Sequence, residues 1–122
     1  MQFTREDANE AHAILSCEEG EVRLRDRTYT SSLIVTRNAI IDRWQPADAE
    51  ALTIADFSEL LSLAPEVVLL GTGPRQRIPP PALYADFATR RIGLEVMDSR
   101  AACRTFNLLL SEYRDVALAL LL

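Results

Sequence analysis

The sequence lacks lysine altogether, since all thirteen of its basic residues are arginine. That absence excludes Schiff-base catalysis, the phosphate-binding lysine of a P-loop and the lysine of Ser-Lys hydrolases. Histidine and cysteine are almost as scarce: His12 is the one histidine, and Cys17 and Cys103 stand far apart without a CxxC motif. Because this set offers no zinc-ligand spacing and no histidine near Cys103 in the sequence that would make a catalytic pair, we expect no metal and no cofactor.

Long apolar runs are missing too. No stretch approaches the roughly 18 apolar residues of a membrane-spanning helix. Residues 1–10 show neither the basic nor the apolar region of a signal peptide. We therefore expect a cytoplasmic protein with no membrane span and with both thiols reduced.

The charge is acidic and unevenly placed. The net charge is −5, and residues 1–21 carry six acidic residues against one arginine, so the rest of the chain is balanced. An acidic chain lacks the positive field that phosphate contacts need, and we expect no nucleic acid among its partners. The length of 122 residues predicts a single domain over 1–122. Whether the acidic segment 1–21 is ordered stays open.

The first half of the chain has the pattern of β-hairpins. A weak strand is expected over 11–16, and Val22 and Leu24 alternate with arginines. An apolar run inside 29–36 and the segment 39–41 predict further antiparallel strands. Thr53 with Asp56 then resembles a capping box, which predicts a helix over 54–61 that ends before a proline.

The second half alternates strands and helices. The expected order is a buried strand 67–70 ending at Gly71, a loop 72–80, a helix starting at Pro81 with Gly93 as its C′ residue, a strand 94–97, a long helix capped by Ser99, and an apolar strand 116–121. Helical connections of this length imply parallel strands, and the apolar last strand belongs inside the sheet. The fold predicted is α/β, a three-layer single domain with one mixed sheet, a C-terminal βαβαβ half and N-terminal β-hairpins.

Ligands of open α/β sheets bind beyond the carboxyl ends of the strands, where two loops are expected to meet. The first opens Gly71-Thr72-Gly73 and carries Arg75 and Arg77; the second runs through Asp98 to Ser99 at a helix N-terminus. The first loop satisfies neither the dinucleotide fingerprint nor the P-loop motif. Its glycine amides, its arginines and the helix dipole predict a pocket for a small anion. Alternatively, the glycines only allow a tight turn and the arginines are solvated.

Three further side chains belong to this predicted cleft. Cys103 lies one turn into the long helix, where a thiol is either activated by the helix N-terminus or buried as core. Arg104 and Asn107 lie on the polar flank of that helix and either line the cleft or face solvent. Asp98 is either a general base or a residue that favours the helix N-terminus. No complete catalytic set emerges, so no residue is assigned a catalytic role.

The combined order of several motifs resembles one known family. These motifs are Val68-Leu69-Leu70-Gly71-Thr72-Gly73, Arg77-Ile78-Pro79-Pro80, Gly93-Leu94-Glu95-Val96-Met97-Asp98-Ser99 and Ala102-Cys103-Arg104-Thr105-Phe106-Asn107. They resemble the small single-domain family that includes the mitochondrial complex I assembly factor 3 and the adipogenesis-associated Mth-type domain-containing protein. That family usually has tyrosine at the position of Phe106 and glycine at that of Tyr113.

The resemblance implies a three-layer fold with a mixed sheet and carries over no catalytic residues. Its bacterial members are uncharacterised, and its mitochondrial branch is implicated in assembling respiratory complex I. Three hypotheses follow: a non-enzymatic interaction or assembly-type protein with an unknown protein partner, a binder of a small anionic metabolite at the loop 71–77 with or without enzyme activity, and a thiol protein acting through Cys103. We rank them in that order.

Overall fold

The computed structural model describes residues 11–46 and 48–122. The strands are β1 (Ser16–Glu18), β2 (Glu21–Arg23), β3 (Thr28–Tyr29), β4 (Leu33–Thr36), β5 (Ile40–Ile41), β6 (Val67–Gly71), β7 (Gly93–Met97) and β8 (Val116–Leu120). The helices are the 3-10 helices η2 (Ala49–Ala51) and η3 (Ile54–Phe57) and the α-helices α1 (Ser58–Ser62), α2 (Pro81–Thr89) and α3 (Ser99–Ser111). Half of the acidic segment, residues 1–10, lies outside the described part.

The larger sheet has five strands in the order β5-β4-β8-β6-β7. β6 pairs in parallel with both β7 and β8, while β4 pairs antiparallel with β5 and β8. The α/β class, the parallel C-terminal half and the interior position of the last strand are thereby confirmed. All five residues of β8 are buried, which explains why that strand is apolar throughout.

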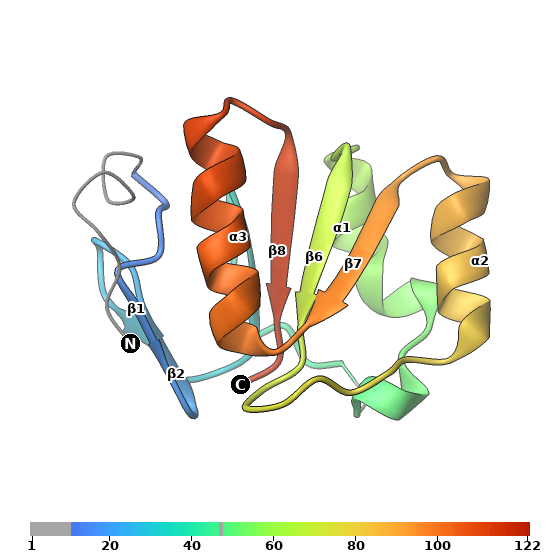
Figure 1. Ribbon diagram of the computed structural model, residues 1–122, viewed down its shortest axis with the longest axis horizontal. Helices are drawn as coiled ribbons and strands as arrows, with labels where there is room; N and C mark the ends of the chain where they lie inside the picture. Colours follow the sequence, from blue (N-terminus) through green and yellow to red (C-terminus); the bar gives the residue numbers. More distant parts are fainter. Residues whose placement is uncertain (1–10, 47) are drawn as a thin grey trace.

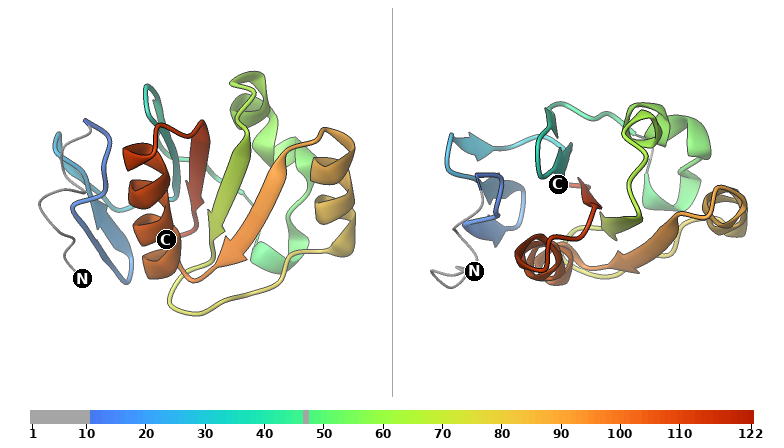
Figure 2. Two further views of the ribbon diagram at one scale, coloured as in Figure 1. Left: turned by 45° about the horizontal axis from the view of Figure 1, so that its top comes forward. Right: turned by 90° about the horizontal axis from the view of Figure 1, so that it is seen from above.

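Both faces of the five-stranded sheet are covered (Figures 1 and 2). On one face, α3 packs Ala102, Cys103, Phe106 and Leu110 against alternate residues of β4, β6 and β8. On the other face, Phe57 of η3, Leu60 of α1 and Leu83 and Phe87 of α2 pack against the intervening residues. Trp44 is buried on this second face, and its indole Nε1 donates to the Asp56 carbonyl at 2.7 Å. The sheet therefore lies between two apolar layers.

The mixed sheet is confirmed, but the first three strands do not join it and form a sheet of their own. Strands β1, β2 and β3 make a separate antiparallel sheet on the side of α3 away from α2 (Figures 1 and 2). The expected strand 29–36 is divided at Ser32, whose carbonyl accepts from Trp44 N–H and whose hydroxyl accepts from Leu122 N–H. These bonds tie Ser32 to the larger sheet, so the chain changes sheets between Tyr29 and Leu33.

The strand expected over 11–16 is also displaced, since β1 begins only at Ser16. Ala13 and Ile14 are nevertheless buried. Leu15 N–H donates to the Arg23 carbonyl at 2.8 Å, which continues the pairing with the β2 side of the hairpin.

The helix predicted over 54–61 exists as two pieces, η3 followed by α1. Its start is correct, because Thr53 N–H donates to Asp56 Oδ2 at 2.9 Å. Pro81 begins α2, also as predicted. The predicted cap of α3 is wrong by one residue. Asp98 is the N-cap, and its Oδ1 accepts from Ala101 N–H at 2.9 Å.

Gly93 is not the C′ residue of α2, because it is already the first residue of β7. Arg91 takes the left-handed conformation instead, with φ of 58°. Its N–H donates to the Ala88 carbonyl, and Ile92 N–H donates to the Phe87 carbonyl, which together make a Schellman motif. Ile92 packs on the core beside α2, and this hydrophobic contact favours the motif without a glycine.

Candidate functional site

The two predicted loops meet where β6 and β7 end. Ser99 links them: its hydroxyl accepts from Gly73 N–H at 2.8 Å, and its own N–H donates to the Gly73 carbonyl at 2.8 Å. Gly73 has φ of 94°, a conformation that favours glycine. The amide that we expected to face an anion is therefore hydrogen-bonded to Ser99.

Gly71 lies where β6 passes closest to the start of α3. A Cβ added to it would lie 2.7 Å from Leu120 Cδ2 and 3.0 Å from Ser99 Oγ. Its carbonyl accepts from Leu121 N–H at 2.9 Å. Gly71 thus allows the close packing of β6, β8 and α3, which is a structural reason for glycine at this position.

The loop after β6 is held by its own side chains. Thr72, almost completely buried, donates through Oγ1 to the Arg75 carbonyl at 2.8 Å and accepts from Arg77 N–H at 2.9 Å. Gln76 Nε2 donates to the Val96 carbonyl of β7 at 2.8 Å. These bonds fix the loop in one conformation without a ligand.

The two arginines of this loop have different surroundings. Arg77 forms a two-pronged ion pair with Glu50 of η2, with Nε 2.8 Å from Oε2. This hydrogen bonding raises the pKa of Arg77 and lowers the pKa of the Glu50 carboxyl. Arg75 is exposed. The two arginines expected to donate to an anion therefore differ, because the guanidinium of Arg77 is already paired with the Glu50 carboxylate.

Asn107 is buried on α3 and faces the N-terminal segment. Its Oδ1 accepts from Ile14 N–H at 2.8 Å, and its Nδ2 donates to the Ile14 carbonyl at 2.9 Å. One side-chain amide thus satisfies both backbone groups of Ile14, as a neighbouring strand would. Arg104, three residues earlier, is exposed. Asn107 is consequently placed between α3 and the first strands rather than beside the loop 71–77.

Cys17 of β1 and Cys103 of α3 lie together in the core, although the sequence separates them widely. The hydrogen bond from Cys103 lowers the pKa of the Cys17 thiol, and the charge of Arg100 lowers it further, against the opposing effect of burial. Burial raises the pKa of the Cys103 thiol well above its ordinary value, and the contact with Cys17 adds to this shift. The two thiols are therefore chemically unequal.

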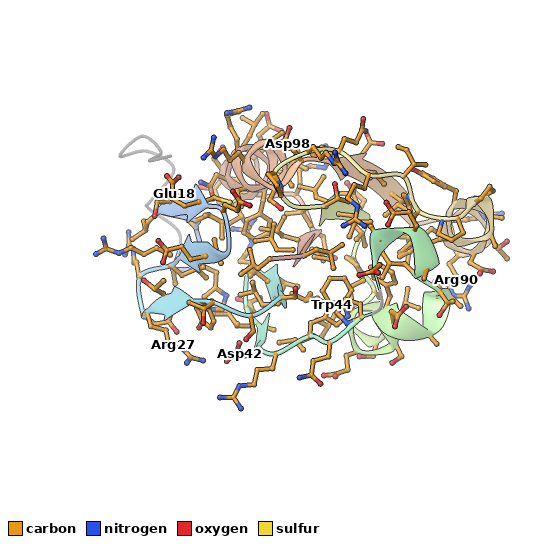
Figure 3. The ribbon with its side chains drawn as sticks, turned by 90° about the horizontal axis from the view of Figure 1, so that it is seen from below. Glu18, Arg27, Asp42, Trp44, Arg90 and Asp98 are labelled. Atoms are coloured by element: carbon orange, nitrogen blue, oxygen red, sulfur yellow. The ribbon has the colours of Figure 1, made fainter. Side chains whose placement is uncertain are left out.

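A cavity of about 550 Å³ opens between the small sheet and the start of α3. It is lined by Cys17, Glu18, Glu19, Gly20, Gly73, Pro74, Asp98, Ser99, Arg100, Leu121 and Leu122. Figure 3 labels Glu18 and Asp98, which come to it from β1 and from the turn before α3. Arg100 Nη2 lies 3.1 Å from Glu18 Oε2, so the one arginine of the lining is paired. Among the described side chains, the lining thus carries three carboxylates and one guanidinium.

The predicted site residues thus divide into three groups. Gly71, Gly73, Asp98 and Ser99 come together at the ends of β6 and β7, as expected. Arg75 and Arg77 do not line the cavity, and Arg104 is exposed. Cys103 packs with Cys17 of β1, and Asn107 bonds Ile14 just before β1. Cys17 and Glu18 were not predicted, since only the separate first sheet brings them to the start of α3.

Across residues 11–46 and 48–122, no three histidine, cysteine, aspartate or glutamate side chains are grouped as a metal site would need. His12 Nδ1 lies 2.7 Å from the Thr36 carbonyl. Every buried side-chain nitrogen or oxygen in the same part of the chain has a hydrogen-bond partner. The helices described there are all too short or too polar to cross a membrane.

Comparison with known proteins gives relatives of similar size and fold. A protein of Francisella tularensis named 13 kDa major membrane protein is 28% identical over 100 residues, which cover 81% of each chain. The NADH dehydrogenase (ubiquinone) 1 alpha subcomplex assembly factor 3 of Danio rerio is 29% identical over 99% of this chain and 70% of its own length. An NMR structure of a Xanthomonas campestris protein matches with a TM-score of 0.82 and 34% identity, over 99% of this chain and 92% of that one.

A family model matches residues 14–121, which include every described helix and strand. The resemblance to the complex I assembly factor family is thereby confirmed. The chain belongs to the family described as a protein of unknown function (DUF498/DUF598).

Proposed function

We propose that this protein is a non-enzymatic interaction protein that binds another protein through the loop between β6 and α2. The observation that carries the proposal is Ile78, an apolar side chain that is 58% exposed in a loop whose other contacts hold it rigid. Exposed apolar side chains on ordered loops are typical of the anchors of protein interfaces.

The rigidity of the loop has two sources. Its first part is fixed by Thr72 and Gln76, as described above. Its second part is Ile78-Pro79-Pro80-Pro81, in which three successive prolines fix φ. Pro79 is buried, and Pro80 has the φ of −58° and ψ of 146° typical of an extended proline segment. A segment that is already ordered loses little entropy on binding, so Ile78 is well prepared to contact a partner.

The buried polar groups are already engaged in structural hydrogen bonds. The buried polar residues of the described chain are Thr72, Ser99 and Asn107. Each forms its hydrogen bonds with the backbone of a neighbouring segment. Binding of a partner through Ile78 does not require any of these three side chains to be free for a ligand.

The relatives indicate where to look for the partner. Several are named as assembly factors of NADH dehydrogenase. In the Bos taurus protein, the match covers 82 residues, which are 44% of its length. Subunits of a respiratory NADH dehydrogenase in the cell that makes this protein are therefore the first partners to test.

The test is site-specific photo-crosslinking in that cell. A benzoylphenylalanine at position 78 is expected to give a discrete crosslinked product, identified by mass spectrometry. The matched control is position 63, since Leu63 is also apolar and 44% exposed but precedes β6 at the opposite end of the sheet. Ile78→Asp should reduce capture of the same partner at least tenfold, as expected for an interface anchor.

Two results would overturn the proposal. One is the absence of any product specific to position 78. The other is the same set of products from positions 78 and 63, which would mean nonspecific collision. Circular dichroism of Ile78→Asp controls for folding.

A further inference from the structure

Strand β7 is an open edge of the five-stranded sheet. It is the last strand in the order β5-β4-β8-β6-β7, and it pairs with β6. Figure 1 shows it as the outermost strand on the side of α2. No residue of β7 is fully buried, whereas all of β6 beyond its first residue is. Strands at such an edge present backbone groups that can pair with a further strand.

The outward backbone groups of β7 belong to Leu94 and Val96. Gly93 N–H donates to the Glu66 carbonyl at 3.1 Å, on the side of β6. Because the backbone groups of successive residues point to opposite sides of a strand, those of Leu94 and Val96 point away from β6. Gln76 agrees with this direction, since its Nε2 donates to the Val96 carbonyl. In the described part of the chain, no hydrogen bond reaches Leu94 N–H, the Leu94 carbonyl or Val96 N–H.

The side chains of β7 define which strand fits this edge. Leu94 and Val96 are half-buried and pack against the apolar layer that includes α2. Glu95 projects from the opposite face and is exposed, and it takes part in none of the ion pairs of the described residues. A strand added here would gain most from apolar side chains beside Leu94 and Val96 and a basic side chain beside Glu95.

Glu95 also disfavours pairing with a second copy of the chain. Two antiparallel β7 strands that used the outward groups of both Leu94 and Val96 would place their two Glu95 side chains directly opposite each other. Such a pair is not hydrogen-bonded, so its side chains are closest and like charges destabilise it. Charge complementarity therefore favours a basic segment of a different protein.

We propose that β7 binds an extended basic segment of another protein, which adds antiparallel to it as a further strand of the larger sheet. Leu94 N–H, the Leu94 carbonyl and Val96 N–H form main-chain hydrogen bonds with the segment, and a lysine or arginine of the segment faces Glu95. Antiparallel pairing is the slightly more stable arrangement per residue. The site makes no use of Ile78, so it is independent of the proposed function.

The test is a titration of the isotope-labelled chain with the synthetic peptide acetyl-TTVKVTT-amide, followed by nuclear magnetic resonance. The amide resonances of Leu94 and Val96 are expected to shift in a saturable way, and their hydrogen exchange to slow. Replacing the lysine of the peptide with glutamate should weaken binding about fivefold.

Charge reversal on the protein tests the role of Glu95. Glu95→Lys should make the chain prefer the glutamate peptide. Glu21→Lys makes the same change of charge at an exposed position of the small sheet and should keep the preference for the lysine peptide. The spectra of both variants report whether they fold.

N-methylated peptides test the main-chain bonds. In the proposed register the amides of the two valines face β7 and that of the lysine faces away. Methylation of both valine amides should therefore abolish binding, whereas methylation of the lysine amide should leave it within about twofold. The reverse pattern would mean a parallel segment and would contradict the proposal.

The wild-type chain alone can also overturn the proposal. One such result is the absence of saturable shifts at Leu94 and Val96 with millimolar peptide. Another is equal affinity for the lysine and glutamate peptides. A third is exchange at Leu94 and Val96 that slows as the concentration of the chain rises without peptide, which would assign this edge to a second copy.

Discussion

The two sheets of this protein are stabilised in different ways. The five-stranded sheet is buried on both faces, and its central strand β8 has no exposed residue. The three-stranded sheet buries one face only, so Val22 is buried between the exposed Glu21 and Arg23. Burial of apolar surface accounts for the first sheet. The second also relies on particular contacts with α3: Asn107 bonds Ile14, just before β1, and Cys103 packs in the same buried cluster as Cys17.

This difference predicts that the two sheets respond to different substitutions. The larger sheet should be sensitive to changes in the packing of its core. A small sheet with short strands is marginal by itself and depends on its attachment. Asn107 is therefore better understood as part of that attachment than as part of a ligand site.

The largest expected effect comes from breaking the attachment. Asn107→Ala leaves the N–H and the carbonyl of Ile14 buried without partners, which should cost roughly 3 kcal/mol of the free energy of unfolding. Urea denaturation measures this loss. Asn38→Ala is the matched control, because Asn38 is exposed and its replacement should change stability by less than about 0.5 kcal/mol. Equal effects of the two substitutions would show that the Asn107 amide is not a structural tie.

A second prediction concerns the packing of the larger sheet. Gly71→Ala places a Cβ 2.7 Å from Leu120 Cδ2 and 3.1 Å from Ser99 Cα, so the buried Leu120 side chain must shift and the start of α3 must yield slightly. We expect a loss of about 2 kcal/mol, as for other overpacked cores. At Gly93, on the neighbouring strand, the nearest atom would be Val67 Cγ2 at 3.4 Å. Gly93→Ala should therefore change stability very little. Thermal unfolding of the two variants measures the difference in stability between them.

The smallest effect should have the opposite sign. Tyr113, the C′ residue after α3, has φ of 59° and an exposed side chain. Tyr113→Gly removes the cost of this conformation and should raise stability by about 1 kcal/mol relative to Tyr113→Ala. Both variants lose the contact of the ring with Arg37, so their difference isolates the backbone. Identical unfolding midpoints would contradict the account of this helix end.

The resemblance implies a glycine at position 113 in relatives, and the end of α3 offers a physical reason for one. The preceding helix ends in a Schellman motif, in which Arg114 N–H donates to the Leu109 carbonyl and Tyr113 N–H to the Leu110 carbonyl. Glycine adopts the required left-handed conformation without strain, whereas this chain accepts a tyrosine there.

Most of the C-terminal half could be predicted from the sequence. Val68, Leu69 and Leu70 form an uninterrupted apolar run, and Pro81 marks a helix start, so local patterns alone locate β6 and α2. The N-terminal half was harder, because strands of two to four residues carry little periodic signal. The separation of its sheet depends on Ser32, whose bonds to Trp44 and Leu122 are invisible in the local sequence.

The candidate site was predictable only in outline. That Gly71, Gly73, Asp98 and Ser99 converge follows from the rule for strand ends, and the structure bears it out. The pairing of Arg77 with Glu50 and of Cys17 with Cys103 could not be foreseen, since both join segments that are distant in sequence. For Cys17 and Cys103, the sequence does not reveal that the first sheet lies against α3.

Hydrogen exchange on the wild type and Asn107→Ala tests the central claim most directly, namely that Asn107 holds the small sheet to α3. The account predicts that in the wild type the amides of β1–β3, such as that of Val22, open at a lower free energy than those of β6 and β8, and that in the variant the amides of β1–β3 exchange roughly 100-fold faster still. Amides of β1–β3 that are as well protected as those of β6 and β8 in the wild type, or that keep their protection in the variant, would contradict it.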